Sequence, residues 1–126
     1  FYDAVTAFRL AATERQLRNT LKQLTGVNIA LRRRLLQPAA TLSLAKSLGG
    51  LVCLKRLEAD VSFSSIGEEG AVWLAKAIGS LHGLQHLELS LAGSGMGVAG
   101  TKKLSQELCS LRSLLRLKLD MSFNDI

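Results

Sequence analysis

The chain has 126 residues, of which 48% are hydrophobic and 5% aromatic, and its formal net charge is +6. This length suits one domain, and the apolar content is sufficient for a hydrophobic core. No apolar run reaches the roughly 18 residues of a membrane-spanning helix, and no short apolar segment with a small-residue cleavage site marks a secretory signal. We therefore expect no transmembrane span.

Residues 1–20 have a composition that favours a helix, because Ala, Val, Phe and Leu interleave with arginines. We predict an amphipathic helical cap that covers one end of the array that follows. The alternative is a basic amphipathic helix for a membrane surface or for targeting. Asp3 and Glu14 argue against that alternative, because they reduce the positive charge of the segment.

The positive charge is concentrated near the N-terminus, since residues 1–34 carry seven basic and two acidic side chains whereas the remainder carries nine and eight. The only run of like charge, Arg32-Arg33-Arg34, follows the first predicted strand. Such a run contacts phosphate groups in some proteins and is a solvated loop in others, and the sequence leaves both interpretations open.

Leucines recur every thirty residues through residues 21–126. The repeating positions are Leu51, Leu54 and Leu57, then Leu81, Leu84 and Leu87, then Leu111, Leu114 and Leu117. A fixed period of this length indicates stacked supersecondary units, each of which buries a face against the next. We count one degenerate unit, two complete units and one truncated unit, so the chain as given stops in mid-repeat, as a stretch of something longer would.

Each unit reads as a strand, a turn and a helix. In residues 84–91 the period is two, so Leu87 and Leu89 point to one side and Glu88 to the other. A turn rich in Gly and Ser follows at residues 92–97, and then a helix over residues 98–109. Strand, helix and strand at fixed intervals predict a parallel sheet with every helix on one side. Because helices are wider than strands, we expect the sheet to bend with its strands on the concave side, and we expect Leu87 and Leu117 to be equally buried.

The segment Leu114-x-x-Leu117-x-Leu119-x-Met121-x-x-Asn124-x-Ile126 resembles a leucine-rich repeat, and residues 67–78 resemble the helical half of its ribonuclease-inhibitor-like class. The resemblance covers residues 21–126 and implies a curved α/β solenoid that binds proteins. It matches the asparagine of the family only at Asn124, because Arg34, Ser64 and Ser94 occupy that position in the other units. Arginine does not suit a buried loop position, so we expect an irregular first turn.

The polar side of the strands presents three rows of side chains that make a candidate protein-binding surface. The rows are Arg56, His86 and Arg116, then Glu58, Glu88 and Lys118, then Asp60, Ser90 and Asp120. Four acids against three bases make a mixed surface. It lacks the run of cations and the stacking aromatics of a nucleic-acid groove.

Other candidate sites have plain alternatives. His86 lies in a ladder between Arg56 and Arg116, so we favour a surface role over catalysis. The glycines of residues 93–97 lack the Lys-Ser/Thr ending of a phosphate loop. Trp73 aligns with positions that tolerate polar residues and is a candidate convex contact, with partial burial between helices as the alternative.

Cys53 and Cys109 do not occupy the same repeat position and form no metal set with the two histidines. Two such thiols fit an intracellular, reducing compartment such as the cytoplasm or an organelle interior. We expect a non-catalytic scaffold or protein-interaction module without cofactor or metal, working as part of a multi-subunit complex. The alternative is a structural subunit of a large assembly that contacts RNA or acidic protein through its basic N-terminal region.

Overall fold

The computed structural model describes residues 23–124. The predicted cap over residues 1–20 lies outside them. The described chain alternates strands and helices in the order β1 (Gly26–Ala30), α3 (Pro38–Gly49), β2 (Arg56–Asp60), α4 (Gly67–Gly79), β3 (His86–Ser90), α5 (Gly97–Cys109) and β4 (Arg116–Asp120).

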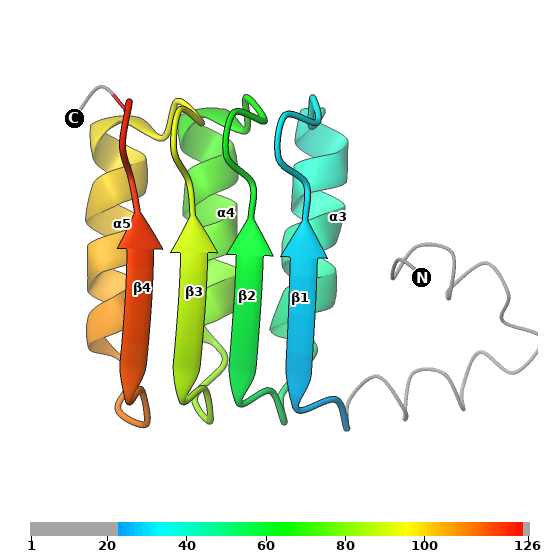
Figure 1. The fold of residues 1–126 in the computed structure, drawn as a ribbon, viewed down its shortest axis with the longest axis vertical. Coiled ribbons are helices and arrows are strands. Elements are labelled where there is room, and N and C mark those ends of the chain that lie inside the picture. The colour runs from blue at the N-terminus through cyan, green and yellow to red at the C-terminus, as the bar shows by residue number, and fades with distance from the viewer. Residues whose placement is uncertain (1–22, 125–126) are drawn as a thin grey trace, which may run out of the picture.

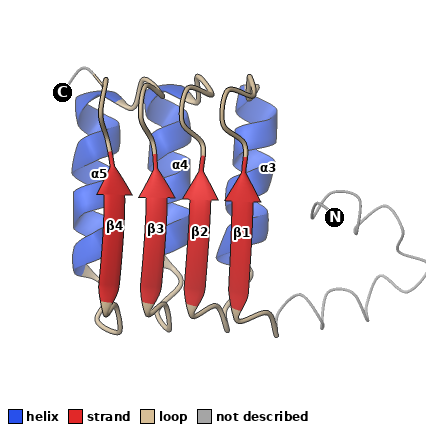
Figure 2. Cartoon of the chain, in the orientation of Figure 1, coloured by secondary structure: helices blue, strands red, loops and turns tan. Residues whose placement is uncertain are grey.

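The four strands form one parallel sheet in the order β1-β2-β3-β4. Each residue pairs with the one thirty positions further on, so that Glu58 lies opposite Glu88 and Glu88 opposite Lys118. Figures 1 and 2 show helices α3, α4 and α5 behind the sheet, and no described helix lies on the opposite side of the strands. The predicted α/β class, the parallel sheet and the one-sided arrangement of helices are confirmed.

The alternation of side chains in the strands separates a buried side from an open side. Leu57 and Leu87 are 0% and 2% exposed, whereas Glu88 between buried neighbours faces solvent. Burying a leucine side chain contributes about 1.5–3 kcal/mol. The repeating leucines therefore hold β2 and β3 against the helices.

Leu117 does not match its prediction, because 48% of its surface is exposed although it occupies the position of Leu87. β4 lies at the edge of the sheet, and no described element packs beyond it. Leu117 points to the helix side of the sheet, but β4 has a described neighbour, β3, on one side only.

Helix boundaries follow from local chemistry. Glu68 and Glu69 lie in the first turn of α4, where carboxylates interact favourably with the helix dipole. At the other end the Ser80 hydroxyl donates to the Ala77 carbonyl oxygen at 2.6 Å. The Glu68 carboxylate also accepts a hydrogen bond from the Ala99 amide at 2.9 Å, and so satisfies a free donor at the start of α5 from the neighbouring helix.

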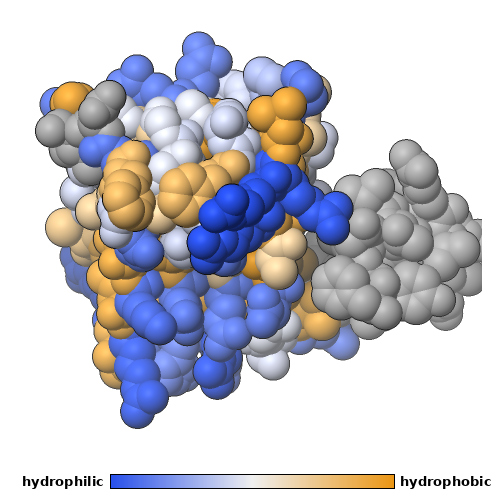
Figure 3. Space-filling model, turned by 45° about the horizontal axis from the view of Figure 1, so that its top comes forward, coloured by the Kyte–Doolittle hydropathy of each residue, from blue (hydrophilic) through white to orange (hydrophobic). Residues whose placement is uncertain are grey.

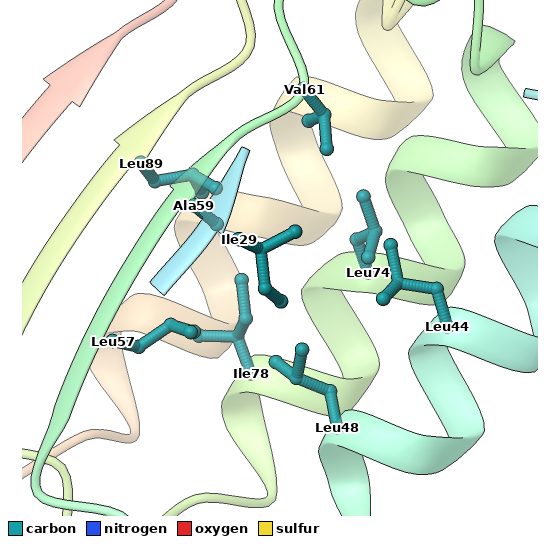
Figure 4. A pocket seen from close by; sticks show the side chains of 9 residues that line it. All are labelled: Ile29, Leu44, Leu48, Leu57, Ala59, Val61, Leu74, Ile78 and Leu89. Atoms are coloured by element: carbon teal, nitrogen blue, oxygen red, sulfur yellow. The ribbon is translucent and has the colours of Figure 1, made fainter. Parts of the chain in front are cut away.

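The core lies between the sheet and the helices. Leu74 and Leu104 approach it from α4 and α5 and are 5% and 2% exposed. Figure 4 shows side chains from the strands and from α3 and α4 converging on one small void of about 10 Å³. This volume is about that of a single water probe, and apolar side chains alone line it, so it is a packing defect and not a ligand site.

The turns after the strands are tied to one another by side chains at the position of the asparagine. Asn124 accepts from the Gly95 amide at 3.0 Å and donates to the Leu91 carbonyl oxygen at 2.9 Å. Ser64 makes a shorter link, from its hydroxyl to the Leu31 carbonyl oxygen at 2.6 Å. Serine thus replaces part of the bonding of asparagine.

The expected irregularity of the first turn is small. Arg33 has φ 59°, close to the 55° of Phe63 at the equivalent position. The Arg34 amide donates to the Leu31 carbonyl oxygen at 3.2 Å, as the Ser94 amide does to Leu91, while the residue itself is exposed. α3 starts at Pro38, one repeat position later than α4 and α5. The first turn is less irregular than predicted, because the exposed side chain of Arg34 does not occupy a buried position in the turn.

Candidate functional site

The nine polar residues predicted as a binding surface lie together on the side of the sheet that no described helix covers, which we call the strand face. The pairing of the strands places His86 between Arg56 and Arg116, Glu88 between Glu58 and Lys118, and Ser90 between Asp60 and Asp120. These are the three predicted rows. Their geometry therefore agrees with the sequence, whereas their role in binding stays a prediction.

Most charges in the middle row are neutralised within the face. The Arg56 guanidinium lies 3.0 Å from a Glu58 oxygen, and the Asn28 amide donates to the other oxygen of that carboxylate at 3.1 Å. Lys118 lies 3.3 Å from Glu88. Exposed pairs of this kind contribute little to stability, so they set the pattern of charge more than the strength of the fold.

Arg116 and His86 differ from these residues. Within residues 23–124, neither forms an ion pair. They line an open hollow of about 550 Å³ on the strand face, together with Arg56, Lys118 and Leu115. Leu115 is 74% exposed. The hollow thus combines the exposed apolar side chain of Leu115 with the guanidinium of Arg116, which has no ionic partner among the described residues.

The third row is held by turns at the strand ends. The Asp60 carboxylate accepts from the Ser62 amide at 3.0 Å and from the Ser62 hydroxyl, and Asp120 and Ser122 repeat the arrangement. The hydrogen bond from the Ser122 hydroxyl, followed by that from its amide and by the nearby positive charge of Arg32, lowers the pKa of Asp120 below its ordinary value. These interactions favour the charged form of the Asp120 carboxylate.

A second surface was missed at the level of sequence. Arg33, Phe63, Gly93 and Phe123 occupy the same position in the loops after β1, β2, β3 and β4, and Arg32 lies beside them. We call these five residues the loop ridge. The thirty-residue spacing of Arg33, Phe63 and Phe123 is visible in the sequence, but these turn positions lie outside the repeating leucines that predicted the strands and helices.

The arginine run is therefore only in part a solvated loop. The guanidinium carbons of Arg32 and Arg33 lie 5.7 and 5.5 Å from the centroid of the Phe63 ring. These distances are within the range of cation–π interactions. Arg34, the third member of the run, is exposed.

The remaining candidates are dispersed. Trp73 is half-buried and packs against the core, which agrees with the alternative of partial burial, and its contact with a partner stays a prediction. His82 is exposed in the loop before β3. Cys53 and Cys109 are free and exposed.

Within residues 23–124, no group of three or more His, Cys, Asp or Glu side chains is placed to hold a metal ion. No helix of the same stretch is long and apolar enough to cross a lipid bilayer.

Comparison of the chain with protein-family models, with curated proteins and with solved structures gave no match.

Proposed function

We propose that the chain is a leucine-rich-repeat solenoid with thirty-residue units, curved with its strands inside, and that it is a non-catalytic module that binds another protein through the strand face. The observation that carries this proposal is the strand face, with its mixed charges and its open hollow. Protein interfaces typically combine an apolar anchor with a polar rim. Leu115 surrounded by Arg116 and His86 has this composition.

Arg116 is the residue that we expect to contribute most to binding. Its neighbours Arg56 and Lys118 already have carboxylate partners, whereas Arg116 has none among the described residues. Arginine is enriched among the residues that dominate interface energies, where truncation costs about 2 kcal/mol or more. An acidic group of the partner beside an apolar side chain would fit Arg116 and Leu115 together.

The cellular setting belongs to the same proposal. Two exposed thiols without a disulfide suit an intracellular, reducing compartment. Small modules that carry binding faces commonly work as parts of larger assemblies, and we propose a multi-subunit complex as the setting.

Photo-crosslinking at defined positions tests the strand face. A benzophenone side chain is introduced in place of Glu88 or Lys118 on the strand face, and in place of Lys102 or Gln106 on the exposed side of α5 as matched controls. Irradiation in extracts of cells that produce the chain should crosslink a discrete protein to the strand-face probes only. Arg116→Glu should abolish that product.

The opposite distribution would contradict the proposal. If the probes on α5 captured the same proteins with equal yield, or if Arg116→Glu left the product unchanged, the partner would not bind at the strand face. Far-UV circular dichroism of each variant shows that the fold is retained, which is expected because all four probe positions are exposed.

A further inference from the structure

The loop ridge runs across all four strand ends, and its row of side chains is interrupted only at Gly93. Its four repeat positions, Arg33, Phe63, Gly93 and Phe123, have φ values between 55° and 59°, so their backbones point side chains in the same direction. Backbone hydrogen bonds join consecutive loops, from Arg33 to Ser62 at 2.9 Å and from Phe63 to Ala92 at 2.8 Å. The line therefore has a fixed geometry and is not a chance encounter of long side chains.

Planar groups stand next to one another along this line. The guanidinium groups of Arg32 and Arg33 lie over the Phe63 ring, and the centroids of the Phe63 and Phe123 rings are 6.1 Å apart. Gly93 makes this approach of the rings feasible, because a Cβ at that position would lie 2.4 Å from Cε1 of Phe63. The ridge thus consists of two arginines followed by two aromatic rings that lean over a glycine.

The ridge is open to a ligand. Phe123 is 83% exposed and Phe63 is 39% exposed, and the arginines are exposed as well. Within residues 23–124 no carboxylate forms an ion pair with Arg32, Arg33 or Arg34. Figure 3, which brings the strand ends forward, shows strongly hydrophilic and hydrophobic groups side by side on this surface.

The aromatic rings and guanidinium groups of the ridge suit one class of ligand better than others. Unpaired bases stack on aromatic rings and on guanidinium planes, while arginines neutralise the neighbouring phosphates. An acidic polypeptide would satisfy the arginines but has no regular series of flat groups to cover Phe123. A double helix hides the faces of its bases in the stack. A flexible single strand offers phosphates and exposed bases together.

We propose that the loop ridge, with the adjoining Arg34, binds single-stranded nucleic acid, with phosphates against Arg32, Arg33 and Arg34 and a base on the exposed ring of Phe123. The surface is separate from the hollow around Arg116, which lies at the opposite ends of the strands. Variants at the hollow and variants at the ridge can therefore be tested separately, whereas Asp120 of the strand face lies near Arg32 of the ridge.

The test is a titration of the intact 126-residue chain with fluorescent oligouridylate, followed by anisotropy over a series of salt concentrations. Phe123→Ala should weaken binding about 5- to 150-fold, since one stacked base contributes about 1–3 kcal/mol, and it should leave the salt slope unchanged. Arg32→Gln with Arg33→Gln should instead lower the slope of log affinity against log salt by about 0.7 for each lost contact.

Matched controls separate the ridge from general positive charge. Lys46→Gln with Lys102→Gln removes the same charge from exposed positions on α3 and α5, and Leu115→Ala removes an exposed apolar side chain far from the ridge. These variants should bind oligouridylate like the unchanged chain.

Three results would overturn the proposal. The first is no binding of oligouridylate at low salt, and the second is equal losses in the ridge variants and in the lysine controls. The third is competition by polyglutamate as strong as by unlabelled oligouridylate, which would identify the ridge as a site for acidic protein. Preference for oligouridylate over polyglutamate and over a duplex of equal length is the expected result.

Discussion

β3 and β4 have leucines at the same two positions, in His-Leu-Glu-Leu-Ser and Arg-Leu-Lys-Leu-Asp, but these leucines have different environments. Leu87 in β3 is 2% exposed and Leu117 in β4 is 48% exposed. The alternation of residues determines which side of the sheet a leucine faces. Whether the leucine is buried depends on the elements on both sides of its strand, and β4 has a described neighbour on one side only.

The largest loss of stability is expected when the leucines at positions 87 and 117 are compared by replacing each with alanine. Leu87→Ala should lower the free energy of unfolding by about 2–5 kcal/mol, because it leaves a cavity in a closed core. Leu117→Ala should lower it by about 1 kcal/mol, since half of that side chain already faces solvent. Denaturant titration measures both, and equal losses would show that β4 is as enclosed as β3.

Substitutions in the loops after β3 and β4 should also differ in their effect on stability. Gly93→Ala, after β3, should destabilise the chain by about 1–3 kcal/mol, because the residue has φ 57° and its new Cβ would meet the Phe63 ring. Phe123→Ala, after β4, should stay within about 0.5 kcal/mol because the ring is largely exposed.

A double variant separates the two causes at Gly93. If the clash with the ring dominates, Phe63→Ala should restore part of the stability lost in Gly93→Ala. No recovery in thermal unfolding would assign the loss to backbone strain alone. Gly83→Ala, whose new Cβ would have its nearest neighbour at 3.8 Å, is the control for glycine replacement as such.

The difference between Leu87 and Leu117 also shows which structural features the sequence could predict. The leucine period predicted the strands, the helices, the parallel sheet and the three rows of the strand face, because side-chain direction is a local property of the backbone. It was wrong on Leu117, since burial depends on neighbours that a repeat pattern does not specify.

The loop ridge could not be derived from composition, because it arises from positions outside the regular elements. Phe63 and Phe123 lie close together because the loops stack and because Gly93 between them has no side chain. The hollow was missed for a related reason, because Leu115 departs from the polar residues Lys55 and Gln85 at its repeat position. A comparison of equivalent turn residues would have shown the ridge.

A smaller loss of stability is expected when the hydrogen bond from α5 to Glu68 of α4 is removed. Glu68→Ala should destabilise the chain by about 1 kcal/mol, because the Ala99 amide at the start of α5 loses its acceptor. Val98, the equivalent residue of α5, is 66% exposed, so Val98→Ala should change the unfolding free energy by less than about 0.5 kcal/mol. Similar losses in urea titrations of the two variants would contradict a specific cap.

The smallest effect concerns Asp120 at the end of the edge strand. Ser122→Ala should raise the pKa of Asp120 toward its ordinary value, because it removes the hydroxyl that lowers it most. A folded-state pKa below the unfolded value contributes stability above the unfolded value, and this contribution is lost as the pH falls through the folded-state pKa. Carbon NMR titration of the carboxyl group measures the shift, and an unchanged pKa would exclude Ser122 as its cause.

The thirty-residue register places His86 beside Arg116 and Phe63 beside Gly93, so both proposed surfaces depend on it. Disulfide trapping tests it directly in a chain in which Cys53 and Cys109, both exposed, are replaced by serine. Glu88→Cys with Lys118→Cys joins paired positions on β3 and β4 and should oxidise readily, because neighbouring strands lie 4.7–4.9 Å apart. Glu88→Cys with Arg116→Cys or with Asp120→Cys, shifted by two residues, should oxidise much more slowly. Faster oxidation of either shifted pair, followed by mass spectrometry, would contradict the register and with it the arrangement of both surfaces.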